Sequence, residues 1–380
     1  MSTLTLAART RSAAALLTVD LEAVAANTRL FAGRSDAAIM AVVKADGLGH
    51  GAVEMARTAL DNGAAWLGVT SIDEALQLRA AGLRVPTLSW LNAVDADWSA
   101  AVDAGIDLAV PSRQHLESVS AAGGRARVHL QLDTGMARDG AEPSVWPELC
   151  RAARLAELTG RVDVAGVMGH LGCAAEAVDP CNVLGRRRFA WGVQVARGLG
   201  LRPRWRHLAA TASTLNDPRS HYDLCRIGAG LVGIDPSHTT PLRGAMTLSA
   251  PVVSVRRVRA GTPVGYGHTW TAPTATCLAL LPLGYADGLP RSASGRAEVQ
   301  VRGRRRPLVG TISMDQVVVD LGDEPVRPGE TVTIFGPGEH GEPTVADWAT
   351  WAGTIEHEIV TGIGRRVRRS LRPVRSGAMS

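Results

Sequence analysis

Lysine is almost absent from this chain of 380 residues. Of its 41 basic residues only Lys44 is a lysine, and all the others are arginines. The guanidinium group of arginine stays protonated in proteins, so a chain built this way offers almost no side-chain amine that could act as a nucleophile. Lys44, in the segment AIMAVVKADGLGHG (38–51), is therefore the first residue to explain.

Cysteine motifs, metal-ligand spacings and long apolar runs are also missing. The five cysteines show no CxxC spacing, which favours free thiols in a reducing, cytoplasmic setting. The ten histidines show no HxxxH or comparable spacing, so no metal site is predicted. Apolar runs end well before the roughly 18 residues of a membrane span, so no membrane partner is expected. We interpret residues 1–15 as a ragged leader, because the apolar stretch 13–19 is short and lacks a convincing cleavage site.

Aromatic residues make up only 4% of the chain, although the net charge is +5 and the pI about 9.3. The basic clusters lie at 186–188, at 302–306 and in the C-terminal RRVRRSLRPVR (365–375), and no aromatic residue is interleaved with them. This pattern favours solvated faces and a basic tail over binding of polyanions. We therefore predict no nucleic-acid partner.

Short apolar runs alternate with amphipathic segments up to about residue 235. Such alternation favours an α/β fold, here an N-terminal (β/α)8 barrel over residues 16–246 rather than an open sheet. One intervening segment, SIDEALQLRAAG (71–82), has the capping box and terminal glycine of a helix. The predicted strands are 38–43, 65–70, 87–91, 107–111, 127–133, 164–170, 206–211 and 229–234.

From about residue 247 the pattern changes to short β-type runs separated by Gly, Pro and Asp turns. This predicts a separate, mostly antiparallel β-domain over residues 247–380, with a helix only near TVADWATWAG (344–353). In the barrel, several polar residues fall at or near predicted strand ends, where barrel enzymes bind their substrates. They are Lys44, Asp133, His170, Thr211 and the turn 226–228.

A lysine at such a strand end is either a surface charge or an amine that forms a Schiff base with a carbonyl group. The surrounding segment, AVVKADGLGHG, resembles the cofactor-lysine motif of the alanine racemases, pyridoxal-phosphate enzymes with a barrel and a β-domain. The resemblance extends along nearly the whole chain, in the same order as in the family. Its other segments are LLTVDLEAVAANTRLF, QLDTGMARDG, VAGVMGHLGCA, RIGAGLVGIDP, PVGYGHTW, LPLGYADGLPR and GTISMDQVVVDLG.

The resemblance implies an isomerase that interconverts L- and D-alanine with two bases, Lys44 and Tyr266, on opposite faces of the substrate. It implies pyridoxal phosphate bound covalently to Lys44, with His170 stacked on its ring and Arg226 facing its pyridine nitrogen. It places the phosphate against Thr211, Gly228 and Ala229, where backbone N–H groups can hold an anion.

The resemblance also implies how substrate is bound and how the subunits assemble. Arg138 would contact the substrate carboxylate or a cofactor oxygen, the Met314 backbone N–H would donate to that carboxylate, and Tyr285 would line the entrance. In this family Tyr266 and Met314 come from the second subunit, which implies a homodimer with shared active sites.

Four positions depart from the family pattern. Leu48 and His357 stand where the family has phosphate-binding tyrosines, Ala210 replaces an asparagine, and Gln131 replaces a lysine that many members carboxylate. His357 can still donate to a phosphate, whereas Leu48 cannot, and one lost hydroxyl costs about 1–3 kcal/mol of binding. Two alternatives therefore stay open: a related enzyme acting on another amino acid, and a non-catalytic protein that binds the cofactor or another ligand.

Overall fold

The computed structural model describes residues 14–374, so most of the predicted leader lies outside the described residues. The chain divides into two compact units. One is formed by Leu21–Arg243, and the other by the described residues up to Asp20 together with Gly244–Pro373. Most of the predicted barrel, 16–246, lies in the first of these units, whereas residues 16–20 and 244–246 lie in the second, together with the β-type runs.

Eight parallel strands form the core of the unit Leu21–Arg243, in the order β8-β7-β6-β5-β4-β3-β2-β9. Between the outermost two, the Asp223 N–H donates to the Arg206 carbonyl (3.0 Å) and the Arg226 N–H to the Ala209 carbonyl (3.1 Å), so the ring is nearly closed. The predicted barrel is confirmed. Its strands are β2 (Ala38–Val42), β3 (Ala64–Val69), β4 (Thr87–Ser89), β5 (Asp107–Val110), β6 (Ala126–Gln131), β7 (Val162–Met168), β8 (Trp205–His207) and β9 (Leu224–Ile227).

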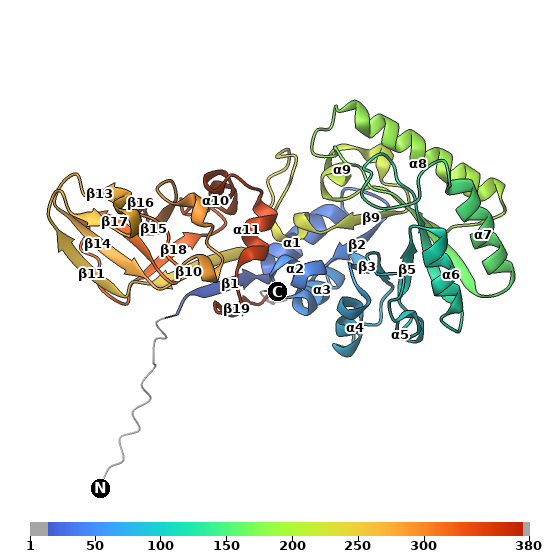
Figure 1. Ribbon diagram of the computed structural model, residues 1–380, viewed down its shortest axis with the longest axis horizontal. Coiled ribbons are helices and arrows are strands. Elements are labelled where there is room, and N and C mark those ends of the chain that lie inside the picture. Colours follow the sequence, from blue (N-terminus) through green and yellow to red (C-terminus); the bar gives the residue numbers. More distant parts are fainter. Residues whose placement is uncertain (1–13, 375–380) are drawn as a thin grey trace, which may run out of the picture. The chain divides into compact units, whose positions relative to one another are not determined.

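Helices connect these strands and lie outside them (Figure 1). The predicted capping box is present in α4, where the Glu74 N–H donates to the Ser71 hydroxyl (3.2 Å). Gly82, at φ +86°, follows the end of this helix. The helices are α1 (Leu21–Ala32), α2 (Lys44–Leu48), α3 (Ala52–Leu60), α4 (Ile72–Ala80), α5 (Trp98–Asp103), α6 (Arg113–Ala121), α7 (Trp146–Leu158), α8 (Pro180–Gly198) and α9 (Thr211–Asn216).

The barrel interior is packed with apolar side chains. Its central cluster consists of Met40, Val42, Trp66, Leu88, Ala109, Met168 and Leu224. Packing there is close enough to require glycine at position 68, because a Cβ would lie 2.7 Å from the Trp90 ring and 2.8 Å from the Met40 sulfur. The strands are therefore held as a solid scaffold, and their C-terminal ends are fixed in position.

One predicted strand, 229–234, is wrong. These residues form the short 3-10 helix η2 (Ala229–Val232), and the eighth strand is β9, one segment earlier. The segment AGLVGI is apolar because it is buried, and burial alone does not distinguish a strand from a helical turn. Gly230 fits there because a Cβ would lie 2.4 Å from the Phe31 ring. Arg226 consequently lies within a barrel strand rather than in a turn.

The second unit is built on a nine-stranded sheet in the order β11-β14-β17-β16-β15-β18-β10-β1-β19, antiparallel except for the pair β1–β19. The predicted, mostly antiparallel β-domain is confirmed, but it contains a second helix, at Glu356–Gly362, beyond the one predicted near 344–353. Two short strands, β12 (Pro263–Val264) and β13 (Trp270–Thr271), pair separately. The sheet strands are β1 (Leu16–Asp20), β10 (Met246–Pro251), β11 (Ser254–Val258), β14 (Thr276–Leu281), β15 (Glu298–Val301), β16 (Arg304–Val309), β17 (Val317–Gly322), β18 (Thr331–Phe335) and β19 (Arg368–Arg372), and the helices are α10 (Val345–Ala352) and α11 (Glu356–Gly362).

Part of the predicted basic tail is an edge strand. Arg368–Arg372 forms β19, pairs in parallel with β1 and is exposed at every position. Arginines along a sheet edge repel a second copy of that edge, which disfavours edge-to-edge aggregation. Beyond position 374 the tail lies outside the described residues.

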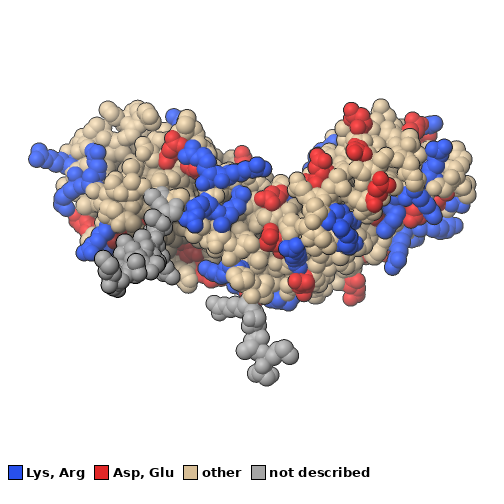
Figure 2. All heavy atoms as spheres, turned by 90° about the horizontal axis from the view of Figure 1, so that it is seen from below, with Lys and Arg blue, Asp and Glu red and all other residues tan. Residues whose placement is uncertain are grey.

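Acidic side chains lie among the basic ones on the face shown in Figure 2. A nucleic-acid-binding surface would gather basic side chains in one patch, so this mixed surface agrees with the prediction of no nucleic-acid partner. That prediction stays untested. Within residues 14–374, no helix is long and apolar enough to cross a membrane.

Candidate active site

Lys44 begins the short segment α2, one residue after strand β2, and the backbone of this segment is a left-handed turn rather than a regular α-helix. The residues that follow it have positive φ: Ala45 (52°), Asp46 (53°), Gly47 (61°), Leu48 (54°) and Gly49 (79°). Left-handed backbone costs about 1–2 kcal/mol for each non-glycine residue, so this turn is strained. Strain of this kind persists only where surrounding contacts hold it, and it concentrates at functional sites.

Glu74 of α4 holds this turn. Its Oε1 accepts the Ala45 N–H (2.7 Å), while Oε2 accepts the N–H (2.8 Å) and hydroxyl (2.7 Å) of Thr70. Burial alone would raise the pKa of Glu74, but the bonds from Thr70, Ala45 and Ser71 outweigh it and lower the pKa. The charged carboxylate therefore links the residue after Lys44 to the end of the neighbouring strand β3.

Glu74→Gln is expected to lower the free energy of unfolding by about 1–3 kcal/mol. The substitution replaces one carboxylate oxygen with an NH₂ group, which cannot accept the backbone N–H that this oxygen accepts now. Urea unfolding measures this loss, with Glu117→Gln as the control. Glu117 pairs with Arg113 at the surface, and its loss should cost less than about 0.5 kcal/mol. Equal effects of the two substitutions would show that Glu74 does not support the turn.

The Lys44 side chain is solvent-exposed at the C-terminal end of the barrel strands. Partial desolvation by neighbouring protein atoms and the Arg138 cation lower its pKa, and the Glu74 carboxylate opposes them. A lowered pKa raises the fraction of neutral amine, which is the nucleophilic and basic form. The lowered pKa favours a reactive amine over a plain surface charge at Lys44.

Arg226 is buried in β9 without a carboxylate partner in the described hydrogen bonds. Its Nη2 donates to the Gly169 carbonyl (2.7 Å), the Leu208 carbonyl (3.3 Å) and Nδ1 of His170 (3.2 Å), and Nη1 to the His207 carbonyl (2.9 Å). Burial, with a contribution from the Arg138 cation, lowers the pKa of Arg226 to about 10. The guanidinium therefore stays charged at neutral pH.

His170 is mostly buried beside this cation. Burial and the charges of Arg226, Arg138 and Lys44 lower its pKa to about 3, so its ring is neutral at pH 7. Because Nδ1 accepts a bond from Arg226, the proton of the neutral ring lies on Nε2. Four residues of the barrel unit that were predicted from sequence therefore interact electrostatically: Lys44, Arg138, His170 and Arg226.

Thr211 and the turn after β9 lie together at the same end of the barrel. The Thr211 hydroxyl accepts the Gly230 N–H (3.2 Å), and Gly228 and Ala229 lead into η2. The first N–H groups of a helix have no acceptor within it, so they can donate to an anion.

The other predicted residues belong to the β-unit. The Tyr266 carbonyl accepts the Thr311 hydroxyl (3.2 Å), and the Ala286 N–H donates to the Met314 carbonyl (3.0 Å). These bonds join the predicted tyrosine, GYADG and MDQ segments. The side chains of Tyr266, Tyr285 and Met314 are exposed by 74%, 40% and 52%. His357 lies in α11 and is partly buried.

Two family models cover almost the whole described chain: the N-terminal domain of alanine racemase matches residues 19–236, and its C-terminal domain matches 245–371. The chain belongs to the alanine racemase family. The alanine racemase of Thermobifida fusca is 46% identical over 92% of this chain and 96% of its own length.

Solved alanine racemases have the same fold. The enzyme from the D-cycloserine producer Streptomyces lavendulae superposes with a TM-score of 0.93 at 42% identity, covering 95% of this chain and 98% of that one. The Bartonella henselae enzyme, whose structure contains covalently bound pyridoxal phosphate, gives 0.86 at 28% identity, covering 95% and 100%. The family predicted from the sequence is confirmed.

A hydrogen-bonded series of side chains that sequence reasoning missed leads away from Arg226 through the barrel of this alanine racemase homologue. Arg226 Nη1 donates to His207 Nδ1 (3.1 Å), His207 and His129 are joined between Nε2 and Nδ1 (2.8 Å), and His129 Nε2 meets Asp107 Oδ2 (3.2 Å). Arg226 can only donate, so His207 Nδ1 accepts its proton and His207 Nε2 donates to His129 Nδ1. His129 Nε2 then donates to Asp107, which also pairs with Arg127 (3.0 Å). The series fixes the orientation of the Arg226 guanidinium.

Acid should destabilise the protein through His170. Its pKa is about 3 in the folded chain against an ordinary 6.5, so the unfolded chain binds more protons between these values. Stability present above pH 6.5 is therefore lost as the pH falls toward 3, by roughly 2 kcal/mol at pH 5. Burial lowers the pKa of His207 as well, which adds in the same direction.

Urea unfolding of the wild type and of His170→Gln across this pH range separates the His170 contribution from that of the carboxylates. The difference between the two proteins should shrink steadily on acidification. A difference that is independent of pH would contradict a neutral, buried His170.

Three of the four family departures lie in the barrel unit. Leu48 is buried within the left-handed turn, and Ala210 precedes α9, where its N–H donates to the Ser213 hydroxyl (2.9 Å). Gln131 is buried at the end of β6, and its Oε1 has no hydrogen-bond partner among the described residues. A buried amide oxygen without a donor is costly, so Gln131 can accept a hydrogen bond from a group that enters the site.

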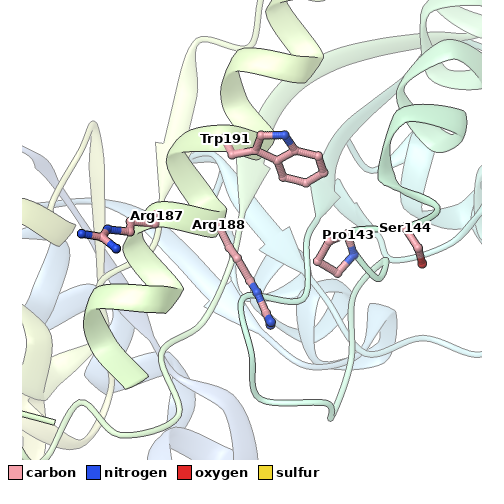
Figure 3. Close-up of a pocket in the computed structure, with 5 residues that line it drawn as sticks. All are labelled: Pro143, Ser144, Arg187, Arg188 and Trp191. Carbon is pink, nitrogen blue, oxygen red and sulfur yellow. The ribbon is translucent and has the colours of Figure 1, made fainter. Parts of the chain in front are cut away.

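A separate depression of about 480 Å³ lies against α8. Figure 3 shows Arg188 and Trp191 of this helix facing the loop that carries Pro143 and Ser144. Its lining residues include neither Lys44 nor any carboxylate or imidazole, so the depression holds no group suited to moving a proton at neutral pH.

Proposed function

We propose that the chain interconverts L- and D-alanine with pyridoxal phosphate as its cofactor. The observation that carries this proposal is the placement of Lys44. The only lysine of the chain stands at the C-terminal end of a barrel strand, on a strained turn, with its pKa lowered by partial desolvation and Arg138. The alanine racemases named above support the assignment of reaction and substrate.

The residues of the barrel unit fit the cofactor. Lys44 supplies the amine for covalent attachment, and the charged Arg226 can donate a hydrogen bond to a pyridine nitrogen without giving up its proton. Thr211, Gly228 and Ala229 would hold the phosphate. When bound, pyridoxal phosphate withdraws electrons from the α-carbon of the amino acid and so acidifies its proton.

Proton transfer would be the task of two side chains on opposite faces of the substrate. Lys44, released as a free amine when substrate binds, would exchange the α-proton on one face at Nζ. The Tyr266 phenol would do so on the other face at its hydroxyl oxygen. Arg226, which is hydrogen-bonded to His170, would supply a fixed positive charge to the proton-transfer site.

We also propose a cytoplasmic homodimer in which Tyr266 and Met314 of one copy complete the site of the other. The exposure of these two side chains on the β-unit leaves them available to a second copy. The five free cysteines accord with a reducing compartment. Arg138 and the Met314 N–H would bind the substrate carboxylate, and Tyr285 would line the entrance.

Chiral chromatography of the products tests this function. The protein, loaded with pyridoxal phosphate, is incubated separately with L-alanine, L-serine and L-lysine. We expect alanine to reach an equal mixture of enantiomers, with at least about tenfold lower kcat/KM for the larger amino acids. Racemisation of another amino acid in preference to alanine would overturn the substrate assignment. If none of the three amino acids is racemised, the enzyme assignment is overturned.

Tyr266→Phe tests the second base. Removal of the phenolic oxygen should lower kcat in both directions by about 100- to 10,000-fold, the usual contribution of one acid–base group. Tyr222→Phe is the matched control, because this third tyrosine packs edge-on against Phe189 in the barrel unit. Full activity in Tyr266→Phe would contradict its role as the second base.

A further inference from the structure

Two cysteines and a carboxylate meet at the start of helix α8. The Sγ atoms of Cys173 and Cys181 and a carboxylate oxygen of Asp179 all lie within 4.8 Å of one another. Cys173 is in the loop that follows β7, Asp179 is the N-cap of α8, and Cys181 lies in the first turn of that helix. Among residues 14–374, no other group of three His, Cys, Asp or Glu side chains converges in this way.

The local backbone holds these three groups in place. One Asp179 oxygen accepts the Cys181 N–H (2.8 Å), which fixes the carboxylate beside the thiol. The buried Asn182 donates from Nδ2 to the carbonyls of Cys173 (3.2 Å) and Glu176 (2.9 Å), which fixes the loop. The ligand atoms are therefore brought together by contacts that need no metal, so little ordering remains for a metal to supply.

We propose that Cys173, Asp179 and Cys181 form a binding site for zinc or a similar thiophilic divalent cation. Two thiolates and one carboxylate are ligands that zinc favours, and a water molecule would complete a tetrahedral shell. On binding, the two S–H bonds break, two metal–sulfur bonds form, and both protons pass to solvent. The site shares no residue with the proposed racemase site, so it does not depend on that function.

The carboxylate favours a metal over a disulfide. Three groups that become anions together repel one another, and a divalent cation removes that repulsion. A disulfide would need only the two sulfur atoms and an added oxidant, and the Asp179 carboxylate would then serve only as the cap of α8.

Metal uptake by the full-length, reduced protein tests the site. After treatment with a chelator and a phosphine reductant, the protein is dialysed against zinc, and bound metal is measured by mass spectrometry. Cobalt(II) then reports the ligands, because thiolate coordination gives a charge-transfer band and tetrahedral geometry gives intense visible bands. We expect about one metal ion per chain, bound at micromolar or lower concentration.

Matched variants identify the ligands. Cys173→Ser and Cys181→Ser should each weaken zinc binding at least about tenfold and reduce the cobalt–thiolate band, because only one thiolate remains. Asp179→Asn keeps the helix cap but should weaken zinc binding and retain the band. Cys277→Ser, in β14 of the other unit, should change neither. Circular dichroism confirms that each variant folds.

The proposal is overturned if the reduced chain takes up no zinc, or if uptake is unchanged in both Cys173→Ser and Cys181→Ser. A Cys173–Cys181 disulfide that forms in air, together with no metal uptake after reduction, would identify a redox pair and would also overturn it.

Discussion

Lys44→Arg is expected to abolish racemisation, with a fall in kcat/KM of at least about a thousandfold. Arginine keeps the positive charge and the length of the side chain, but its guanidinium can neither attack a carbonyl nor act as a base at neutral pH. The variant should also fail to retain pyridoxal phosphate through dialysis. Product analysis and the absorption spectrum of the dialysed protein measure these two losses separately.

The control for this substitution is structural. Lys44 is exposed and starts a turn held by backbone contacts and Glu74, so Lys44→Arg should change the melting temperature of the cofactor-free protein only slightly. Activity retained at even a tenth of the wild-type level would show that another amine, or no amine, carries the reaction.

Arg226→Lys should lower kcat by roughly 100-fold while changing KM much less. Lysine preserves the charge, but a single ammonium group cannot reproduce the fork that bonds Gly169, His207 and His170. The cation would lose its fixed position in the site, and proton transfer would slow. Steady-state kinetics in both directions measure the effect, together with the pH profile of kcat.

Arg206→Lys is the matched control, because Arg206 also makes a bidentate contact within the barrel unit, to Asp223 (2.6 and 2.7 Å). It should lower stability without a comparable fall in kcat. Similar kinetic losses in the two variants would mean that Arg226 acts only through folding.

Much of the barrel could be predicted from sequence because its strands are short apolar runs between amphipathic helices. The prediction failed where both patterns are equally apolar: AGLVGI is buried as a 3-10 helix, and the true strand, Leu224–Ile227, contains the charged Arg226. A buried arginine interrupts the apolar pattern by which a barrel strand is recognised, so the strand that contains Arg226 was missed.

The sequence predicted that polar residues gather at the strand ends, but it did not predict the hydrogen-bonded series that continues from Arg226. His129, His207 and Asp107 lie in separate strands, and no spacing within the sequence shows that they meet. Gly166 gives the clearest local trace of this contact, since a Cβ there would lie 2.3 Å from His129 Nδ1. The proximity of Cys173, Asp179 and Cys181 is equally a product of folding, through the loop that Asn182 braces.

Isotope exchange on the unmodified protein tests the central claim most directly. The cofactor-loaded protein is incubated with L-alanine in D₂O. The enantiomers are then separated, and the deuterium content of each is measured by mass spectrometry. Two bases that exchange protons with solvent, Lys44 and Tyr266, predict α-deuterated D-alanine from the earliest times, followed by deuterium in the recovered L-alanine. Deuterium in neither enantiomer, or deuterium in L-alanine without formation of D-alanine, would contradict the account.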